Sequence, residues 1–176
     1  MRPKSTLLTA DTLRDLLSYN PDTGELRWRN PNGRHRAGVG HLDATNGYRQ
    51  ICVHGNRFRA HRLIWCWMTG EWPPPHLDVD HINGERCDNR WCNLRLANMS
   101  QQRANVAQKR GGNRSGFKGV RPNNSRWQAQ MVEGGKIMNL GAFDTPEDAA
   151  RAYDRAAVAR WGEYAKTNQM LGLLSD

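Results

Sequence analysis

The stretch from Leu77 to Val106, LDVDHINGERCDNRWCNLRLANMSQQRANV, contains residue types that can perform chemistry. A carboxylate and an imidazole stand side by side at Asp80 and His81, and an amide follows at Asn93. A neutral imidazole titrates near physiological pH and can accept a proton from water. Carboxylate and amide oxygens are suitable ligands for a hard cation such as Mg²⁺. These residue types together indicate hydrolysis assisted by a metal ion.

The elements that must position these side chains follow from local patterns. Residues 77–82 alternate apolar and polar side chains and are rich in β-formers, which predicts a strand. A polar loop leads to a second short strand over residues 93–97. Asn98 suits an N-cap and Gln101 stands three residues later, as in a capping box, so a helix should begin there. The order strand, loop, strand, helix brings four residues towards one place: Asp80, His81, Asn93 and Gln102.

This arrangement resembles the ββα-metal motif of HNH endonucleases. The resemblance rests on the run DHING, the dipeptide DN at 88–89, the NLR at 93–95 and the helix opening SQQRAN. It implies that His81 is the general base and that Asn93 braces the loop. Asp80 and Gln102 would then hold one divalent metal ion. Gln102 departs from the family, which usually has Asn or His there; its amide oxygen can still bind a hard cation, but its side chain is one methylene longer.

The chemistry fits a phosphodiester, whose charge repels nucleophiles and whose leaving group is poor. A cation held by carboxylate and amide oxygens can neutralise charge on the phosphorane and on the departing 3′ oxygen. One carboxylate plus one amide is a small ligand set, which suits Mg²⁺ because this ion keeps several waters. We therefore expect Mg²⁺, with Mn²⁺ as the alternative, and the family implies 5′-phosphate and 3′-hydroxyl products. An isolated Asp-His pair is usually only a turn, but the downstream asparagines at matching spacing argue against that interpretation.

The composition sets the class of protein and its partners. At 176 residues the chain has room for one or two small domains. Its net charge of +9 fits double-stranded DNA as the partner, although solvated protein faces are often basic as well. The sequence lacks both a membrane-spanning apolar run and a signal-peptide core. We expect a cytoplasmic protein of a bacterial or phage-infected cell, a monomer or homodimer, without membrane or small-molecule partners.

The four cysteines do not form paired CxxC knuckles. Cys87 and Cys92 flank the loop of the motif, where some HNH proteins bind a structural zinc. Zinc needs four ligands, and the sequence offers no convincing second pair. Structural zinc is therefore not expected, and neither is a disulfide in an intracellular chain.

The region before the motif predicts further small elements that complete a nuclease domain over residues 1–107. A helix over residues 9–18, a short strand over 25–29 and a hairpin around His54-Gly55-Asn56 precede a helix over 60–69. His61 lies on the apolar face of that last helix. We interpret it as a buried core residue rather than a second catalytic histidine, because a histidine in such a position is more often part of the core.

Residues 108–115, QKRGGNRS, predict a linker, because they combine paired glycines with basic side chains. The segment could lie along a phosphate backbone or act as a plain tether. Six residues of the motif and the linker are assigned to DNA contacts: Arg95, Arg103, Asn105, Lys109, Arg110 and Arg114.

A second module is predicted over residues 116–176. Strands are expected over 116–121, 126–132 and 136–143, followed by a helix that Thr145 caps and Gly162 ends. The helix has an apolar face that can cover a three-stranded sheet. The sequence thus predicts an α+β protein, in which a ββα-metal nuclease domain precedes a small three-stranded antiparallel sheet packed on one helix.

This second module resembles the plant ethylene-response-factor (apetala-type) DNA-binding domain, through the runs FKGVR, RWQAQM, LGAFDTPEDAARAYDRAA and GEYAKTN. In that family the sheet lies in the DNA major groove. The resemblance implies four residues that face DNA: Lys118, Arg121, Trp127 and Gln130. Val132 and Asn139 replace an arginine and a tryptophan that are usual in the plant motif, so the plant target sequence is not carried over. Trp127 could instead pack on the helix, since a buried indole is common.

The sequence therefore predicts a site-preferring HNH endonuclease acting on DNA, of phage or homing-element origin by resemblance. One alternative is a DNA-binding regulator with a decayed nuclease fold, which Gln102 favours and the intact Asp80 and His81 oppose. A second alternative is a nonspecific toxin nuclease, which has no need of the appended sheet module.

Overall fold

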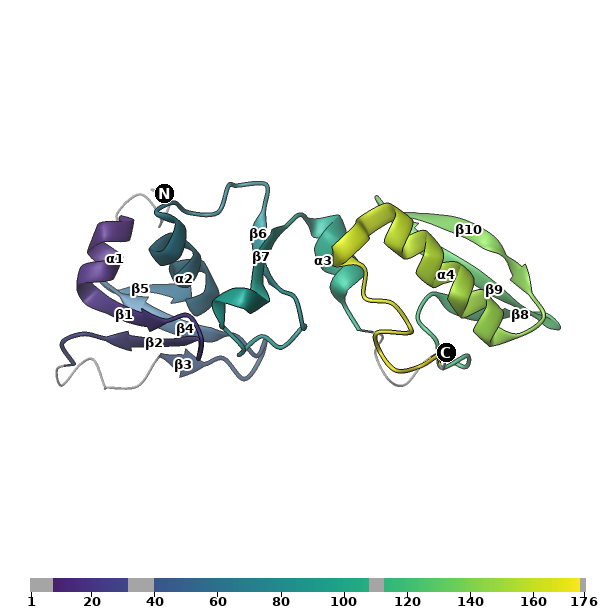
Figure 1. The fold of residues 1–176 in the computed structure, drawn as a ribbon, viewed down its shortest axis with the longest axis horizontal. Coiled ribbons are helices and arrows are strands. Elements are labelled where there is room, and N and C mark those ends of the chain that lie inside the picture. The colour runs from purple at the N-terminus through teal and green to yellow at the C-terminus, as the bar shows by residue number, and fades with distance from the viewer. Residues whose placement is uncertain (1–7, 32–39, 108–112, 175–176) are drawn as a thin grey trace. The chain divides into compact units, whose positions relative to one another are not determined.

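The structure, a computed structural model, describes residues 8–31, 40–107 and 113–174. The chain divides into two compact units, Met1–Ala97 and Asn98–Asp176 (Figure 1). Both units contain helices and antiparallel strands, which agrees with the predicted α+β class. Within the described residues, none of the helices is both long and apolar enough to cross a membrane.

The first unit begins with helix α1, Ala10–Leu16, and a β-hairpin. The Thr9 side chain caps α1 by accepting a hydrogen bond from the Thr12 backbone. Strands β1, Leu17–Asn20, and β2, Glu25–Trp28, pair antiparallel. Leu17 and Leu26 of this hairpin are buried, so the hairpin is anchored to the core of the unit.

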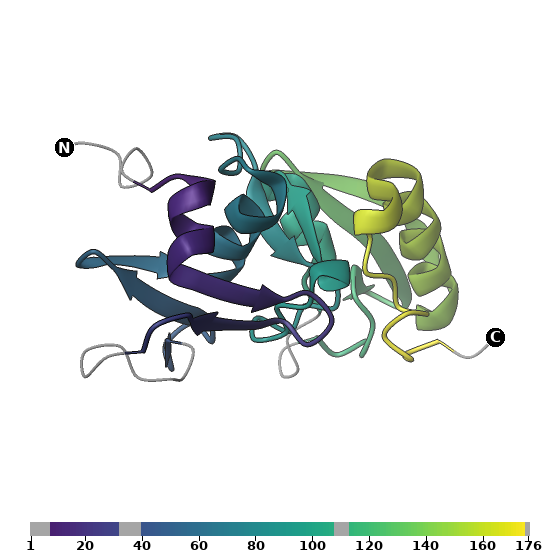
Figure 2. The ribbon, with the colours of Figure 1, turned by 60° about the vertical axis from the view of Figure 1, so that its left-hand side comes forward.

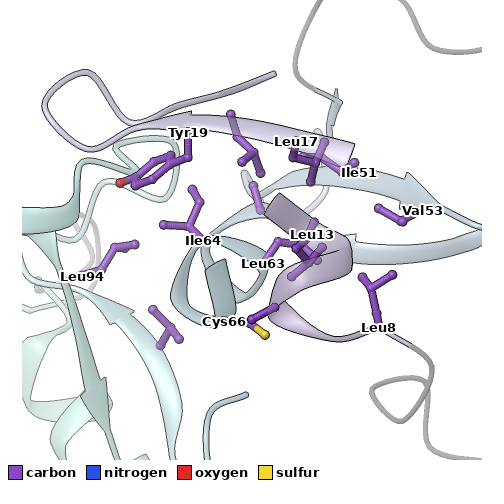
Figure 3. Packing of buried hydrophobic residues seen from close by; sticks show 14 residues of the cluster. Leu8, Leu13, Leu17, Tyr19, Ile51, Val53, Leu63, Ile64, Cys66 and Leu94 are labelled. Atoms are coloured by element: carbon purple, nitrogen blue, oxygen red, sulfur yellow. The ribbon is translucent and has the colours of Figure 1, made fainter. Parts of the chain in front are cut away.

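A three-stranded sheet and helix α2 supply the rest of that core. The sheet has the order β3-β4-β5, formed by His41–Leu42, Arg49–Val53 and Asn56–Arg59. Helix α2, Ala60–Thr69, follows β5 directly and ends at Gly70, whose φ of 87° suits a left-handed helix cap. The side chains of α1, α2 and the strands meet in one hydrophobic cluster, in which Leu13, Leu63 and Ile51 are fully or almost fully buried (Figure 3).

The last part of the first unit is an antiparallel strand pair with a long polar loop. Strand β6 spans Asp78–His81 and β7 spans Leu94–Ala97, with a 3₁₀ helix, Trp91–Asn93, immediately before β7. The register pairs Asp80 with Arg95 and His81 with Leu94. Both strands were predicted at these positions to within one or two residues.

The second unit begins with helix α3, Met99–Asn105. It carries the predicted capping box: the Asn98 side chain accepts from the Gln101 backbone, and the Gln101 side chain accepts from the Asn98 backbone. The sequence assigned this helix to the nuclease domain, whereas the unit boundary precedes it. The reason is packing, because Ser100 accepts a hydrogen bond from the Trp161 indole (3.1 Å) and the Ala104 carbonyl accepts one from the Lys166 backbone (3.1 Å).

A three-stranded antiparallel sheet and one helix form the rest of the second unit. The sheet has the order β10-β9-β8, with β8 at Val120–Asn123, β9 at Arg126–Glu133 and β10 at Lys136–Phe143. Helix α4, Pro146–Trp161, packs along the sheet (Figure 2). Its cap at Thr145 and its end at Gly162 confirm the predicted boundaries. Strand β8 starts four residues later than predicted, because Gly116 and Gly119 both take a φ of 76°, which is a turn conformation.

Candidate active site

The imidazole of His81 is buried at the end of β6 and is held by the loop that follows. Only 3% of the residue is exposed. Its Nε2 lies 3.2 Å from Oδ1 of Asn89, and the Asn89 amide nitrogen donates to the Cys87 carbonyl at 3.4 Å. The ring is therefore fixed by a side chain eight residues further along the chain.

Burial in the protein keeps this imidazole neutral near pH 7. Burial lowers the pKa of His81, and the guanidinium of Arg86 adds to this effect. The hydrogen bond to Asn89 and the nearby carboxylates of Asp80 and Asp88 act in the opposite direction and raise it. Because burial is the largest contribution, the ring is in the form that can accept a proton.

Asn93 connects the two sides of the loop between the strands. Its amide nitrogen donates to the Asp88 carbonyl at 2.7 Å and to Oδ1 of Asn83 at 3.0 Å. Its amide oxygen accepts from the Asn83 backbone at 2.9 Å. The residue is buried, and its bonds are of the kind that a loop brace would make. Its contribution to catalysis stays a prediction.

Asp88 adds a second set of bonds within the same loop. Its carboxylate accepts from the Asn83 amide at 2.7 Å and from two nitrogens of Arg90 at 2.8 and 2.6 Å. Hydrogen bonding to Arg90 is the main reason that the pKa of Asp88 is lowered to about 2. The side chains of Asp88, Asn83 and Arg90 therefore form a hydrogen-bonded cluster within the loop.

Asp80, the predicted metal ligand, forms an ion pair with Arg95. Oδ2 of Asp80 lies 3.3 Å from Nε of Arg95, and the two side chains are only 15% and 10% exposed. The residues are opposite each other on β6 and β7, which places their side chains on the same face. The guanidinium of Arg95 is engaged with the neighbouring carboxylate, and its contact with DNA stays a prediction.

His61 packs against His81, and the sequence did not predict this contact. Its ring centroid is 5.0 Å from that of His81 in an edge-on arrangement and 5.0 Å from that of Tyr48. The residue is 2% exposed, so the predicted burial is confirmed. Burial, helped by the charges of His81, Arg59 and Arg62, lowers the pKa of His61 to about 2. No local sequence signal indicates a contact between side chains twenty positions apart.

The predicted metal ligands fit a hard cation by donor type. A carboxylate has about four lone-pair sites, so the ion pair with Arg95 does not exclude a metal contact at Asp80. Gln102 lies half-buried on α3 in the second unit, while Asp80 lies in the first, so the pairing of the two residues stays a prediction. Among the described side chains, no three His, Cys, Asp or Glu residues form a group that could hold a metal.

The predicted DNA contacts of the motif and the linker fall into three groups. Arg103 and Arg114 are exposed, as such contacts require, whereas Asn105 is buried, and the DNA contacts of all three stay predictions. Lys109 and Arg110 lie outside the described residues. The four cysteines are free thiols, and Cys87 and Cys92 are both exposed.

The ammonium of Lys118 is hydrogen-bonded within the second unit. Its ammonium donates to the Ala104 carbonyl at 2.6 Å and to the Lys166 carbonyl at 2.9 Å, and lies 5.9 Å from the Tyr153 ring centroid. Burial lowers its pKa to about 8. The Lys118 backbone N–H donates to Oδ1 of Asn168 at 2.6 Å, which holds this residue against the C-terminal segment, and its contact with DNA stays a prediction.

Trp127 is partly buried in the second unit, and its predicted contact with DNA stays a prediction. It packs with Val120 and Ala129 in the cluster that α4 covers, so it lies on the helix side of the sheet. The alternative interpretation of a packed indole therefore describes the structure. Side chains alternate along β9, so the opposite face, which we call the outer sheet face, is formed by Arg121, Gln128, Gln130, Val132 and Ile137.

Two of the predicted DNA contacts, Arg121 and Gln130, lie on the outer sheet face. Arg121 is exposed and donates twice to Oε1 of Gln128, at 2.9 and 2.6 Å. Oε1 of Gln130 is buried and has no hydrogen-bond partner within the part of the chain that the structure describes.

Comparisons with known proteins agree with this geometry. Residues 58–104 match the family model of HNH endonucleases. An uncharacterized HNH endonuclease of Acanthamoeba polyphaga mimivirus is 29% identical over 114 residues, which covers 65% of this chain and 59% of the relative. No solved structure matches the chain.

Shorter matches link the chain to plant transcription factors. APETALA2-like protein 2 of Oryza sativa subsp. indica is 49% identical over 57 residues, which covers 31% of this chain and 13% of the relative. An ethylene-responsive transcription factor of Arabidopsis thaliana is 50% identical over 56 residues, 30% of this chain and 22% of the relative. The chain therefore spans less than two thirds of each of these relatives. The family match covers the strand pair that carries His81, so residues 58–104 are similar to HNH endonucleases.

Proposed function

We propose that this protein is a metal-dependent, site-preferring DNA endonuclease that hydrolyses phosphodiesters to 5′-phosphate and 3′-hydroxyl ends. The observation that carries the proposal is the buried, neutral imidazole of His81 at the end of β6, held by Asn89 and adjacent to Asp80. A fixed neutral imidazole beside a carboxylate is the combination that a water-activating base and a cation site require.

In the proposed reaction His81 accepts a proton from a water molecule as the water oxygen attacks phosphorus. The bond between phosphorus and the 3′ oxygen breaks, and the departing oxygen takes up a proton from solvent to become a hydroxyl. Asp80 and Gln102 would hold the divalent metal, which supplies charge neutralisation at the phosphorane and the leaving oxygen. Asn93 keeps the loop closed, so that His81 does not need to be repositioned in each cycle.

DNA is the proposed partner of the second unit as well. The exposed Arg121 on the outer sheet face and the exposed Arg103 and Arg114 can neutralise phosphates. The similarity to plant transcription factors supports a role of this sheet in choosing the target. We also propose a phage or homing-type origin and a cytoplasmic location. A monomer with one site would nick one strand, and a homodimer could cut both.

A DNA-binding regulator with an inactive nuclease domain is the second candidate. The ion pair between Arg95 and Asp80 favours it, because a guanidinium occupies part of the carboxylate that the metal would use. Gln102, which stands where the family has Asn or His, points the same way.

Plasmid conversion separates the two candidates. Supercoiled DNA would be incubated with the wild type in Mg²⁺, in Mn²⁺ and with a chelator, beside His81→Ala and a control, His76→Ala, at an exposed histidine of the same unit. The nuclease proposal expects metal-dependent nicking or linearisation that His81→Ala loses and His76→Ala keeps. Folded protein that binds DNA and never cuts in either metal would support the regulator instead.

A further inference from the structure

A neutral imidazole can act as a base only at its unprotonated nitrogen. The hydrogen bond made by one ring nitrogen decides which of the two carries the proton. In His81, Nε2 lies 3.2 Å from Oδ1 of Asn89. The chemical identity of the facing Asn89 atom therefore determines the tautomer.

The surroundings of Asn89 determine which of its amide atoms faces the ring. Its amide nitrogen donates to the Cys87 carbonyl at 3.4 Å, which turns Oδ1 towards His81. An amide oxygen can only accept, so Nε2 of His81 must donate and carry the proton. The nitrogen without a proton in the neutral ring is then Nδ1.

The N-terminal hairpin holds Asn89 in place from a distant part of the sequence. The hydroxyl of Tyr19, on β1, donates to the Asn89 carbonyl at 2.8 Å across seventy residues of chain. Tyr19 is buried, and burial raises its pKa, so the hydroxyl remains a donor. The turn of the hairpin adds a backbone bond of 2.9 Å from Trp91 to the Pro21 carbonyl.

The hairpin also approaches the loop too closely for any side chain at Gly24. A Cβ atom there would lie 2.6 Å from the backbone of both Asn89 and Arg90, and Gly24 has a φ of 74°. Two hydrogen bonds and a backbone-to-backbone contact thus fix the segment that carries Asn89. The His61 ring also packs edge-on against the imidazole, with 5.0 Å between the ring centroids.

We infer that Asn89 is a positioning residue that selects the Nε2-protonated tautomer of His81, and that the β1–β2 hairpin holds Asn89 through Tyr19. The catalytic consequence rests on the proposed nuclease function, because only a base needs a defined unprotonated nitrogen. The tautomer itself is a property of the chain without DNA or metal, so it can be tested independently of activity.

The first test is NMR of the full chain with ¹⁵N-labelled histidine, with the His81 signals assigned by their loss in His81→Ala. The wild type is expected to show a proton coupled to Nε2, in slow exchange with water, and a pyridine-type Nδ1. Asn89→Leu, which removes the acceptor at similar size, should speed up that exchange at least about tenfold. Asn89→Asp, which keeps an acceptor, should retain the slow proton. A wild-type proton on Nδ1, or unchanged exchange in Asn89→Leu, would overturn the inference.

Tyr19→Phe tests the role of the hairpin and also covers the case in which Asn89→Leu does not fold. It removes one hydroxyl and leaves Asn89 in the chain. Faster exchange of the Nε2 proton is expected, smaller in size than in Asn89→Leu. An exchange rate equal to the wild type would show that the hairpin does not hold Asn89.

Cleavage kinetics add the catalytic readout. Asn89→Leu should lower kcat by about tenfold or more with KM for DNA unchanged, because general-base catalysis contributes about 10²–10⁴-fold and part of it depends on the correct tautomer. Asn89→Asp should restore most of the rate. If the wild type itself never cuts DNA, the nuclease proposal fails while the NMR result still decides the tautomer.

Discussion

The guanidinium of Arg95 lies 3.3 Å from the carboxylate of Asp80, directly across the β6–β7 pair. The pair places a fixed positive charge at the carboxylate that we propose as a metal ligand. Removing the charge should therefore favour a cation at Asp80. A positive guanidinium beside the carboxylate repels the metal ion and weakens its binding by on the order of 1 kcal/mol. Arg95→Gln is therefore expected to lower the Mg²⁺ concentration for half-maximal cleavage by about fivefold.

Arg57→Gln, at an exposed position of β5, is the control for this measurement and should leave the Mg²⁺ requirement unchanged. A higher Mg²⁺ requirement in Arg95→Gln would mean that the arginine supports the metal site, for example by orienting the carboxylate.

Gln102→Asn tests the departure from the family pattern. The shorter side chain should bring the amide oxygen to the position that the family uses, so metal-dependent cleavage should rise by about threefold to tenfold, or about 1 kcal/mol. The measurement is the Mg²⁺ dependence of plasmid nicking, with Gln101 left intact so that the helix cap is preserved. Equal or lower activity would show that the glutamine works as it stands.

Acid should destabilise the first unit through His61. Its pKa is about 2 in the folded protein, against an ordinary value of 6.5. Between these values the unfolded chain binds one more proton than the folded chain, so the free energy of unfolding falls as the pH drops below 6.5. The slope from this residue is at most about 1.4 kcal/mol per pH unit.

His61→Phe removes that titration and should flatten the loss of stability between pH 6.5 and pH 5 in urea unfolding. His76→Phe, at an exposed histidine, should keep the wild-type slope. Equal slopes in all three proteins would contradict the assignment of acid sensitivity to His61.

Substitutions at Lys118 and at Arg121 should distinguish a structural role from a role in DNA binding. Lys118→Met removes a donor to two backbone carbonyls and is expected to destabilise the second unit by about 1–3 kcal/mol. Arg121→Met should leave stability within about 0.5 kcal/mol, since the residue is exposed, and weaken DNA binding. Thermal unfolding and DNA titration at two salt concentrations measure both effects. Loss of affinity without loss of stability in Lys118→Met would restore the original DNA-facing interpretation.

Gly119 should be intolerant of any side chain. A Cβ atom there would lie 1.9 Å from the Tyr153 ring, and its φ of 76° is already unfavourable for other residues. Gly119→Ala is expected to cost about 3 kcal/mol or more, measured by thermal unfolding. Gly135→Ala is the matched control, because φ is 80° there but a Cβ would meet nothing within 4 Å; about 1 kcal/mol is expected. Similar losses in both variants would mean that the ring moves aside.

Local signals explain what the sequence predicted well. The capping box at Asn98, the cap at Thr145 and the end at Gly162 each depend on residues within one turn of helix. The strand that carries His81 follows from alternation over a few residues. Such features need no knowledge of the rest of the chain.

The features that the sequence did not reveal depend on distant partners. Lys118 reaches a carbonyl forty-eight residues later, and Tyr19 reaches Asn89 across seventy residues. A lysine or tyrosine in a polar stretch has the same local pattern whether it meets DNA or a buried carbonyl. Trp127 shows the same limit, because the alternation of β9 does not reveal which face α4 covers.

The helix that carries Gln102 is packed by the second unit, through Ser100 on Trp161 and Ala104 on Lys166. An exchange of C-terminal modules between proteins of this kind would therefore be best joined between Ala97 and Asn98. A junction within residues 108–115, where the sequence predicts the linker, would separate helix α3 from its own second unit. The foreign module would then lack the residues that pack against α3 in this chain. The second unit thus begins inside the stretch that matches the HNH endonuclease model.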